Sequence, residues 1–212
     1  VMAFLMLTMI SIMLPRAGVA ADRIDEVLKT EVSVNNSTDA VDAGRSKGVV
    51  RFNHVSFAYP EAEGKVLDDI DFEASPGTTT AIIGSTGCGK STLVNLIPRF
   101  FDVTEGSITL DGRDIRNITL ESLRENIGYV PQKGILFSGT IADNIKYGQL
   151  VESDEDMLEA AEIAQATEFI EAKPDKYESQ VAQGGNNVSG GQKQRLSIAR
   201  AIARDPMIYI FE

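Results

Sequence analysis

The chain has 212 residues, enough for one sizeable domain and an additional segment, and its 43% hydrophobic and 24% charged residues are typical of a globular protein rather than a disordered one. Its 31 acidic and 20 basic side chains give a net charge of -11, which repels a phosphate backbone, so we expect no nucleic acid among its partners. The single cysteine, Cys88, excludes an internal disulfide.

The first 14 residues, VMAFLMLTMISIML, are apolar and uncharged. A run of this length is shorter than the ~20 residues that cross a bilayer, and the chain begins at Val1 rather than at a methionine. We expect residues 1–29 to be the end of a last transmembrane helix with its cytoplasmic extension, because the basic Arg16 follows the run. Two alternatives are a signal peptide, since Gly18-Val19-Ala20 resembles a cleavage site, and a buried helix.

Residues 30–47 are small and polar without a helical period, which predicts a linker. The pattern changes near Gly48, and we expect one domain over residues 48–212. Strands are expected at 49–59, 65–74, 78–84, 106–112 and 125–131, and helical stretches at 90–101, 153–172 and 189–204. Alternation of this kind indicates an α/β sheet with helices packed on it.

A glycine-rich stretch, GSTGCGKST, joins an expected strand to an expected helix. It fits the pattern G-x-x-x-x-G-K-[ST], with Gly84, Gly89, Lys90 and Ser91 at the fixed positions. Glycines let backbone N–H groups converge on phosphate oxygens, Lys90 adds a mobile positive charge, and the Ser91 hydroxyl can bind Mg²⁺. The strand-loop-helix context favours a nucleotide phosphate loop over a glycine-rich turn that binds nothing.

A second anion site is predicted near the end of the chain. Ser189, Gly190, Gly191 and Gln192 begin a helix that runs to about Arg204. A serine and two glycines at a helix N-terminus suit a phosphate group. A single nucleotide has one terminal phosphate, which Lys90 already holds, so this site is surplus unless it serves a nucleotide on another subunit.

These motifs resemble the ATP-binding cassette (ABC) family, whose signature L-S-G-G-Q corresponds to VSGGQ at residues 188–192. The resemblance extends from Gly48 to Glu212, with several motifs in the family's order. It implies a P-loop NTPase cassette of the α/β class, with an N-terminal β subdomain and an α-helical signature subdomain.

The resemblance also implies roles for individual residues. Tyr59 in VSFAYP matches the aromatic that stacks on adenine, and Gln132 in YVPQ matches the glutamine that reaches Mg²⁺ and the attacking water. Cassettes of this family dimerise head to tail, so Ser189 and Gly191 should hold the γ-phosphate of the partner's ATP. The nucleotide-binding residues implied are Tyr59, Gly84, Ser85, Thr86, Gly87, Cys88, Gly89, Lys90, Ser91, Thr92, Gln132, Ser189, Gly190, Gly191 and Gln192.

The last residue lies where the family places its metal site. After four apolar residues the family has an Asp that positions Mg²⁺ and then, usually, a Glu that polarises water; here Ile208–Phe211 are the apolar residues and Glu212 occupies the Asp position. The resemblance implies ATP and Mg²⁺ as cofactors, Ser91, Gln132 and Glu212 as metal ligands, and Gln132 and Glu212 as catalytic residues. Glu212 could also be an artefact of where the sequence ends. We expect the 212 residues alone to bind ATP weakly and to hydrolyse little.

The stretch ILFSGTIADNIKYG, residues 135–148, resembles the LFSGTI-x-x-NI segment of exporter-type cassettes, in which membrane and ATPase parts share one chain. This implies a half transporter that is multi-pass in the cell membrane (inner or plasma), with its cassette on the cytoplasmic side. Membrane lipid and a second half transporter, identical or different, are the implied partners. Lipids, drugs and peptides are the cargoes that the family suggests.

The leading interpretation is thus the ATP-binding and hydrolysing subunit of an ABC exporter, in which ATP-driven dimer closure is coupled to export. One alternative is a degenerate-site half that holds ATP with little hydrolysis, and the residue after Glu212 would distinguish the two. A soluble cassette ATPase of the DNA-repair or chromosome-organising type is disfavoured by the acidic balance and the apolar N-terminus.

Overall fold

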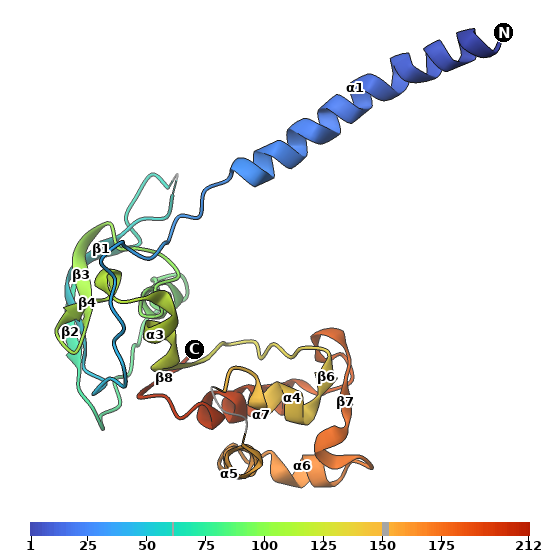
Figure 1. Ribbon diagram of the computed structural model, residues 1–212. Coiled ribbons are helices and arrows are strands. Elements are labelled where there is room, and N and C mark those ends of the chain that lie inside the picture. The colour runs from blue at the N-terminus through green and yellow to red at the C-terminus, as the bar shows by residue number, and fades with distance from the viewer. Residues whose placement is uncertain (61, 150–152) are drawn as a thin grey trace. The chain divides into compact units, whose positions relative to one another are not determined.

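The computed structural model describes residues 1–60, 62–149 and 153–212, and it divides into two compact units, Val1–Asn35 and Asn36–Glu212. Figure 1 follows the chain from the N-terminal helix to the second unit, which holds all the strands.

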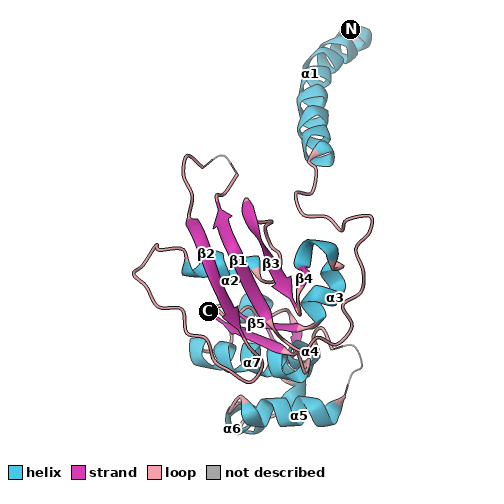
Figure 2. Ribbon diagram, turned by 90° about the vertical axis from the view of Figure 1, so that its left-hand side faces the viewer, coloured by secondary structure: helices cyan, strands magenta, loops and turns pink. Residues whose placement is uncertain are grey.

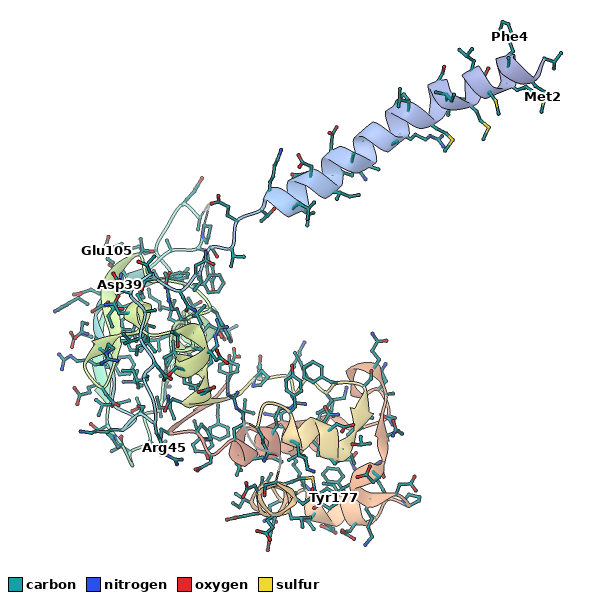
Figure 3. All side chains as sticks on the ribbon, viewed as in Figure 1. Met2, Phe4, Asp39, Arg45, Glu105 and Tyr177 are labelled. Carbon is teal, nitrogen blue, oxygen red and sulfur yellow. The ribbon has the colours of Figure 1, made fainter. Side chains whose placement is uncertain are left out.

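The first unit is dominated by one helix, α1 (Met2–Lys29), which has 28 residues and no buried side chain. It is the one helix of the described residues that is long and apolar enough to cross a membrane, with a mean hydropathy of 1.7 over its most apolar window. The sticks of Figure 3 show Met2 and Phe4 projecting freely from it. At 1.5 Å per residue the helix is about 42 Å long, so it exceeds a hydrocarbon core of about 30 Å.

The second unit begins with an antiparallel sheet in the order β2-β1-β3-β4. Its strands are β1 (Val50–Phe57), β2 (Leu67–Ala74), β3 (Glu105–Leu110) and β4 (Arg113–Asp114). Phe52 of β1 is fully buried and stacks on Phe72 with ring centroids 4.6 Å apart. The β1–β3 register shifts between Asn53 and Ser56, which marks a bulge opposite the start of β3. Figure 2 shows these strands side by side in magenta.

A parallel pair, β5 (Ile127–Val130) and β8 (Ile208–Phe211), joins the same hydrophobic core through Ile127 and Ile210. Short helices accompany it: α2 (Lys90–Leu96), the 3-10 turn η1 (Ile115–Asn117) and α3 (Leu120–Glu125). The carboxyl ends of parallel strands are where α/β proteins place their ligands. Residues 131–132 and Glu212 follow those two ends directly.

Most of the remaining helices form a second core. They are α4 (Ile141–Lys146), α5 (Asp154–Ile163), α6 (Thr167–Glu171) and α7 (Gly190–Ala203), with the strand pair β6 (Gly139–Thr140) and β7 (Gln180–Val181) and the 3-10 turns η2 (Lys176–Glu178) and η3 (Gln183–Gly185). In Figure 1 α4, α5, α6 and α7 lie together beside the region of β1 to β4. Buried alanines such as Ala160 and Ala199 let α5 and α7 approach closely. The predicted cassette with a β subdomain and a helical subdomain is therefore observed.

One expected strand is not observed. Residues 78–84 have no strand hydrogen bonds, and Ile83 is 92% exposed. The prediction from the apolar pattern TTTAIIG was wrong for this structure because a strand needs a neighbour to satisfy its backbone, and no described strand pairs with this segment.

Two expected helical stretches are shorter than predicted. The stretch 153–172 is divided into α5 and α6 by a break at Gln165, whose φ of +55° cannot continue a right-handed helix. The residues on either side of the break, Ala164 and Ala166, are buried in the core. The helix expected at 90–101 ends at Leu96, two residues before Pro98, which cannot donate a helical hydrogen bond.

Part of the expected linker is bound to the second unit. Residues 36–47 belong to that unit, and Asn126, which is 5% exposed, anchors them. Its amide oxygen accepts from the Ser46 N–H at 2.8 Å, and its amide nitrogen donates to the Gly44 carbonyl at 2.8 Å. A polar segment without periodicity can pack in this way because side chains satisfy its backbone groups.

Candidate nucleotide-binding site

The loop Gly84–Gly89 leads directly into α2 at Lys90. Gly89 has a φ of +90°, and a Cβ there would lie 3.0 Å from Leu67 Cδ2 and 3.2 Å from the Val66 carbonyl oxygen. Both its backbone conformation and its contact with residues 66–67 therefore require glycine. Most of the loop is exposed, so its backbone is accessible to a ligand.

Lys90 folds over this loop. Its ammonium donates to the carbonyl oxygens of Gly84 at 2.9 Å and Ser85 at 2.7 Å, and lies 3.7 Å from Cys88 Sγ. The thiol also reaches across the loop, since a Cβ on Gly84 would meet it at 2.4 Å. A flexible ammonium whose contacts are all with atoms of this loop can exchange them for phosphate oxygens.

The residues predicted to bind metal are brought together at the ends of β5 and β8. Hydrogen bonds from the hydroxyl of Ser91, the hydroxyl of Tyr129 and the backbone N–H of Gln132 hold the pKa of Glu212 below its ordinary value, against a smaller opposing effect of burial. A hydroxyl, a carboxylate and a neighbouring amide are the hard oxygen donors that Mg²⁺ prefers when substrate phosphates and water complete its shell. These residues therefore fit Mg²⁺.

In the described part of the chain, clusters of His, Cys, Asp and Glu offer no separate metal site. Among residues 1–60, 62–149 and 153–212 no three of these side chains cluster so that they could hold an ion. His54, the only histidine, instead pairs on the surface with Asp69 at 2.7 Å.

Tyr129 is a site residue that the sequence analysis missed. Its hydroxyl oxygen lies 2.8 Å from Glu212 Oε2 and 2.9 Å from Asn95 Oδ1, and burial raises its pKa. The phenol therefore stays protonated and steadies the Glu212 carboxylate. The only signal in the sequence is a polar-tipped residue in an otherwise apolar strand.

Tyr59 lies beside the same loop. Its hydroxyl oxygen is 3.0 Å from Thr92 Oγ1, and its ring makes edge contacts with Phe57 and Phe101 at centroid distances of 4.9 Å and 5.2 Å. The hydrogen bond brings an aromatic side chain next to the phosphate loop, which suits its predicted contact with a nucleotide base.

The predicted signature residues form the N-terminus of α7. The Ser189 hydroxyl accepts from the Gln192 N–H at 3.3 Å, and the Gln192 side-chain oxygen accepts from the Ser189 N–H at 3.1 Å, a complete capping box. A Cβ on Gly190 or Gly191 would meet nothing within 4 Å. Packing within the chain therefore does not explain the two glycines.

The signature and the phosphate loop belong to different parts of the fold. Val188 and Leu196, on either side of the α7 N-terminus, are buried in the helical core, whereas Leu93, just after the phosphate loop, is buried in the core of the β strands. No hydrogen bond within the described ranges 1–60, 62–149 and 153–212 joins Ser189–Gln192 to Gly84–Thr92. The structure thus brings together Ser91, Gln132 and Glu212, but not the signature.

Known proteins resemble this chain along most of its length. The pattern of the ABC transporter family matches residues 67–212. An uncharacterized ABC transporter ATP-binding protein of Mycobacterium tuberculosis is 50% identical over 220 residues, covering 100% of this chain and 37% of that protein. A beta-(1-->2)glucan export ATP-binding/permease protein of Rhodopseudomonas palustris is 47% identical over 186 residues, covering 88% and 31% respectively.

A solved structure of a bacterial Atm1-family ABC exporter with ATP bound has a TM-score of 0.86 to this chain at 35% identity, covering 96% of this chain and 36% of that one. The chain thus spans about a third of the length of the relatives it matches. The predicted cassette fold is confirmed, and exporters are among the relatives. The chain belongs to the ABC transporter family, and residues 67–212 are its ATP-binding domain.

Proposed function

We propose that this chain is the cassette of an ABC exporter half, in which ATP bound to the phosphate loop is closed in by the signature of a second half transporter. The observation that carries the proposal is the open N-terminus of α7. A Cβ on Gly190 or Gly191 would meet nothing within 4 Å, and their helix packs in a different core from the residues that follow the phosphate loop. A second subunit can therefore bring its own phosphate loop to this face.

The roles of the phosphate-loop residues follow from their chemistry. Lys90 exchanges its contacts with the Gly84 and Ser85 carbonyls for the β and γ phosphates, while loop N–H groups bind the remaining oxygens. Tyr59, held beside Thr92, stacks on the adenine. These contacts fix ATP with its γ-phosphate towards the ends of β5 and β8.

The hydrolytic centre is proposed at those strand ends. Mg²⁺, when bound, neutralises charge on the β and γ phosphates. Ser91 and Glu212 would hold it, and Tyr129 keeps the Glu212 carboxylate in place. Gln132, whose side chain is exposed and whose backbone N–H lies beside Glu212, orients the attacking water.

In the partner's site, Ser189 and Gly191 would contact the γ-phosphate. The α7 N-terminus adds a partial positive charge, and the glycines allow the backbone to approach closely. ATP then stabilises the closed dimer, and hydrolysis with phosphate release favours the open one. α1 is the end of the membrane part that this cycle drives, with the cassette on the cytoplasmic face and the rest of the protein multi-pass in the membrane. The second half transporter is identical or different, and the cargo is exported.

The proposal is tested on the full-length protein with its partner subunit in lipid nanodiscs. It should hydrolyse ATP in a Mg²⁺-dependent way, and Lys90→Ala should lower ATP affinity by about 100-fold, because a charge-assisted contact to phosphate is worth about 3 kcal/mol. Binding of a labelled ATP analogue and phosphate release are measured in parallel. Lys90→Ala protein that binds and hydrolyses like the wild type would refute the assignment of this loop.

A further inference from the structure

The loop that carries Gln132, residues 131–138 and hereafter the Gln132 loop, lies along one face of α7. A Cβ on Gly134 would sit 2.7 Å from Ser197 Oγ and 2.8 Å from the Lys193 carbonyl oxygen. Lys193 and Ser197 are four residues apart, so they share one face of the helix, and Arg200 follows on that face. Figure 1 shows this part of the chain in yellow, running from the end of the β5 region towards β6.

Arg200 fastens the loop to this face. Its Nη1 donates to the Ile135 carbonyl at 2.8 Å, its Nε to the Asn144 carbonyl at 2.8 Å, and its Nη2 to Asn144 Oδ1 at 2.8 Å. One planar group of α7 thereby binds the Gln132 loop and α4 at once.

Asn144 completes the connection from the α4 side. It is 1% exposed, its side-chain oxygen accepts from the Phe137 N–H at 2.8 Å, and its side-chain nitrogen donates to the carbonyls of Phe137 and Thr140 at 2.9 Å each. The oxygen that receives Arg200 therefore also holds the end of the Gln132 loop. This explains the asparagine in the sequence stretch ILFSGTIADNI.

Among the described residues, no carboxylate pairs with the positively charged guanidinium of Arg200. In the part of the chain that the structure describes, no acidic side chain lies within 4.0 Å of it, and its neighbours are the rings of Phe137 and Tyr147, at 5.2 Å and 5.7 Å from the guanidinium carbon. Burial lowers its pKa. Arg200 is partly buried, and a cation removed from water costs free energy unless its hydrogen bonds are satisfied, so this geometry tolerates little change.

We propose that Arg200 is a positioning residue for Gln132. It binds the Gln132 loop to the helix that begins with Ser189–Gln192, so that closure of the signature on a partner's ATP and placement of Gln132 in this chain's own site occur together. The inference rests on the proposed function, because it assigns a coupling between the two sites that the proposed dimer contains. The hydrogen bonds of Arg200 go to Ile135 and Asn144, and not to the phosphate loop, Ser91 or Glu212.

The proposal depends on the planar fork of arginine. A lysine keeps the charge and most of the length but cannot reach the Ile135 and Asn144 oxygens with fixed geometry. Arg195 provides a matched control on the same helix. Its side chain is exposed and donates to the Gln165 carbonyl at 3.1 Å, which is outside the Gln132 loop.

The test compares Arg200→Lys, Arg195→Lys and wild type in the full-length transporter. Arg200→Lys should change the KM for ATP by less than about twofold and lower kcat about tenfold. The reason is that Gln132 acts in the chemical step that follows ATP binding, so its displacement slows that step and does not weaken binding. Arg195→Lys should leave both constants unchanged. Gly134→Ala, which pushes the loop away from α7 without touching Arg200, should reproduce the fall in kcat if Arg200→Lys does not fold.

A spectroscopic readout separates positioning from general damage. These 212 residues contain no tryptophan, so a tryptophan can be introduced as a label by Lys133→Trp, at an exposed position of the Gln132 loop. The fluorescence of this label is obtained by subtracting the spectrum of the protein without it. Adding ATP should change its fluorescence in wild type and in Arg195→Lys, but not in Arg200→Lys, although all three bind ATP.

Each outcome bears on a different claim. Unchanged kcat and an unchanged ATP-induced signal in Arg200→Lys would overturn the coupling, and so would a rise in KM with kcat intact. Absence of Mg²⁺-dependent ATP hydrolysis in the wild type would overturn the proposed function itself, whatever the variants do.

Discussion

Replacing Gly191 with aspartate is expected to abolish ATP hydrolysis while leaving the fold intact. A Cβ at Gly191 meets nothing within 4 Å, and no φ in the left-handed region restricts this position. An acidic residue in the first turn of α7 is favourable for the helix dipole. If this face receives the γ-phosphate of a partner's ATP, however, a carboxylate there repels it, and like charges brought together cost several kcal/mol.

We therefore expect a fall of at least about 100-fold in the ATPase rate of the full-length transporter, since 2.8 kcal/mol corresponds to two decades. The melting temperature should stay the same or rise, and labelled ATP should still bind to the variant's own phosphate loop. Ser37→Asp, the same charge change at an exposed residue, is the control and should be silent. An ATPase rate in Gly191→Asp equal to that of the wild type would show that the signature takes no part in the mechanism.

Gly106→Ala is expected to be the most damaging small substitution in the β strands. Gly106 has a φ of +76°, and its Cβ would lie 2.3 Å from the His54 carbonyl oxygen and 2.4 Å from that of Asn53. These atoms belong to the bulge of β1, which cannot move without disturbing the β1–β3 register. We expect a loss of about 3 kcal/mol or more in the free energy of unfolding, from steric overlap added to backbone strain.

Gly112 provides a control for the strain alone. Its φ is +82°, yet a Cβ there meets nothing within 4 Å, so Gly112→Ala should cost only the ~1 kcal/mol of a left-handed alanine. Urea unfolding of both variants gives the two free energies. Equal losses would mean that the close approach of Gly106 to β1 does not contribute to stability.

The sequence predicted correctly those features that depend on residues close together in the chain. The loop before α2, the helix that begins at Ser189 and the strands β1, β2, β3 and β5 were predicted from glycine spacing, the helix-start pattern and apolar runs, and all are observed. The metal ligands were predicted from a family pattern, and in the structure Ser91 is close enough to Glu212 to help hold the pKa of its carboxyl below the ordinary value.

Long-range pairing limited the prediction elsewhere. The segment 78–84 has the composition of a strand, but whether it becomes one depends on a neighbouring strand, which its own residues do not encode. Tyr129 and Arg200 were missed for a related reason. Each acts on a segment tens of residues away, on Glu212 in one case and on Ile135 and Asn144 in the other.

The central claim is that the α7 N-terminus of one subunit faces the phosphate loop of another across ATP. The most direct measurement places a photoreactive amino acid at the open position Gly190 in the full-length transporter, with Mg²⁺ withheld so that ATP is bound but not hydrolysed. Irradiation with ATP should cross-link two subunits, and mass spectrometry should find the label on a phosphate-loop peptide, which is residues 84–92 if the subunits are identical. Cross-linking that does not depend on ATP, or that joins position 190 to any other segment, would contradict the account.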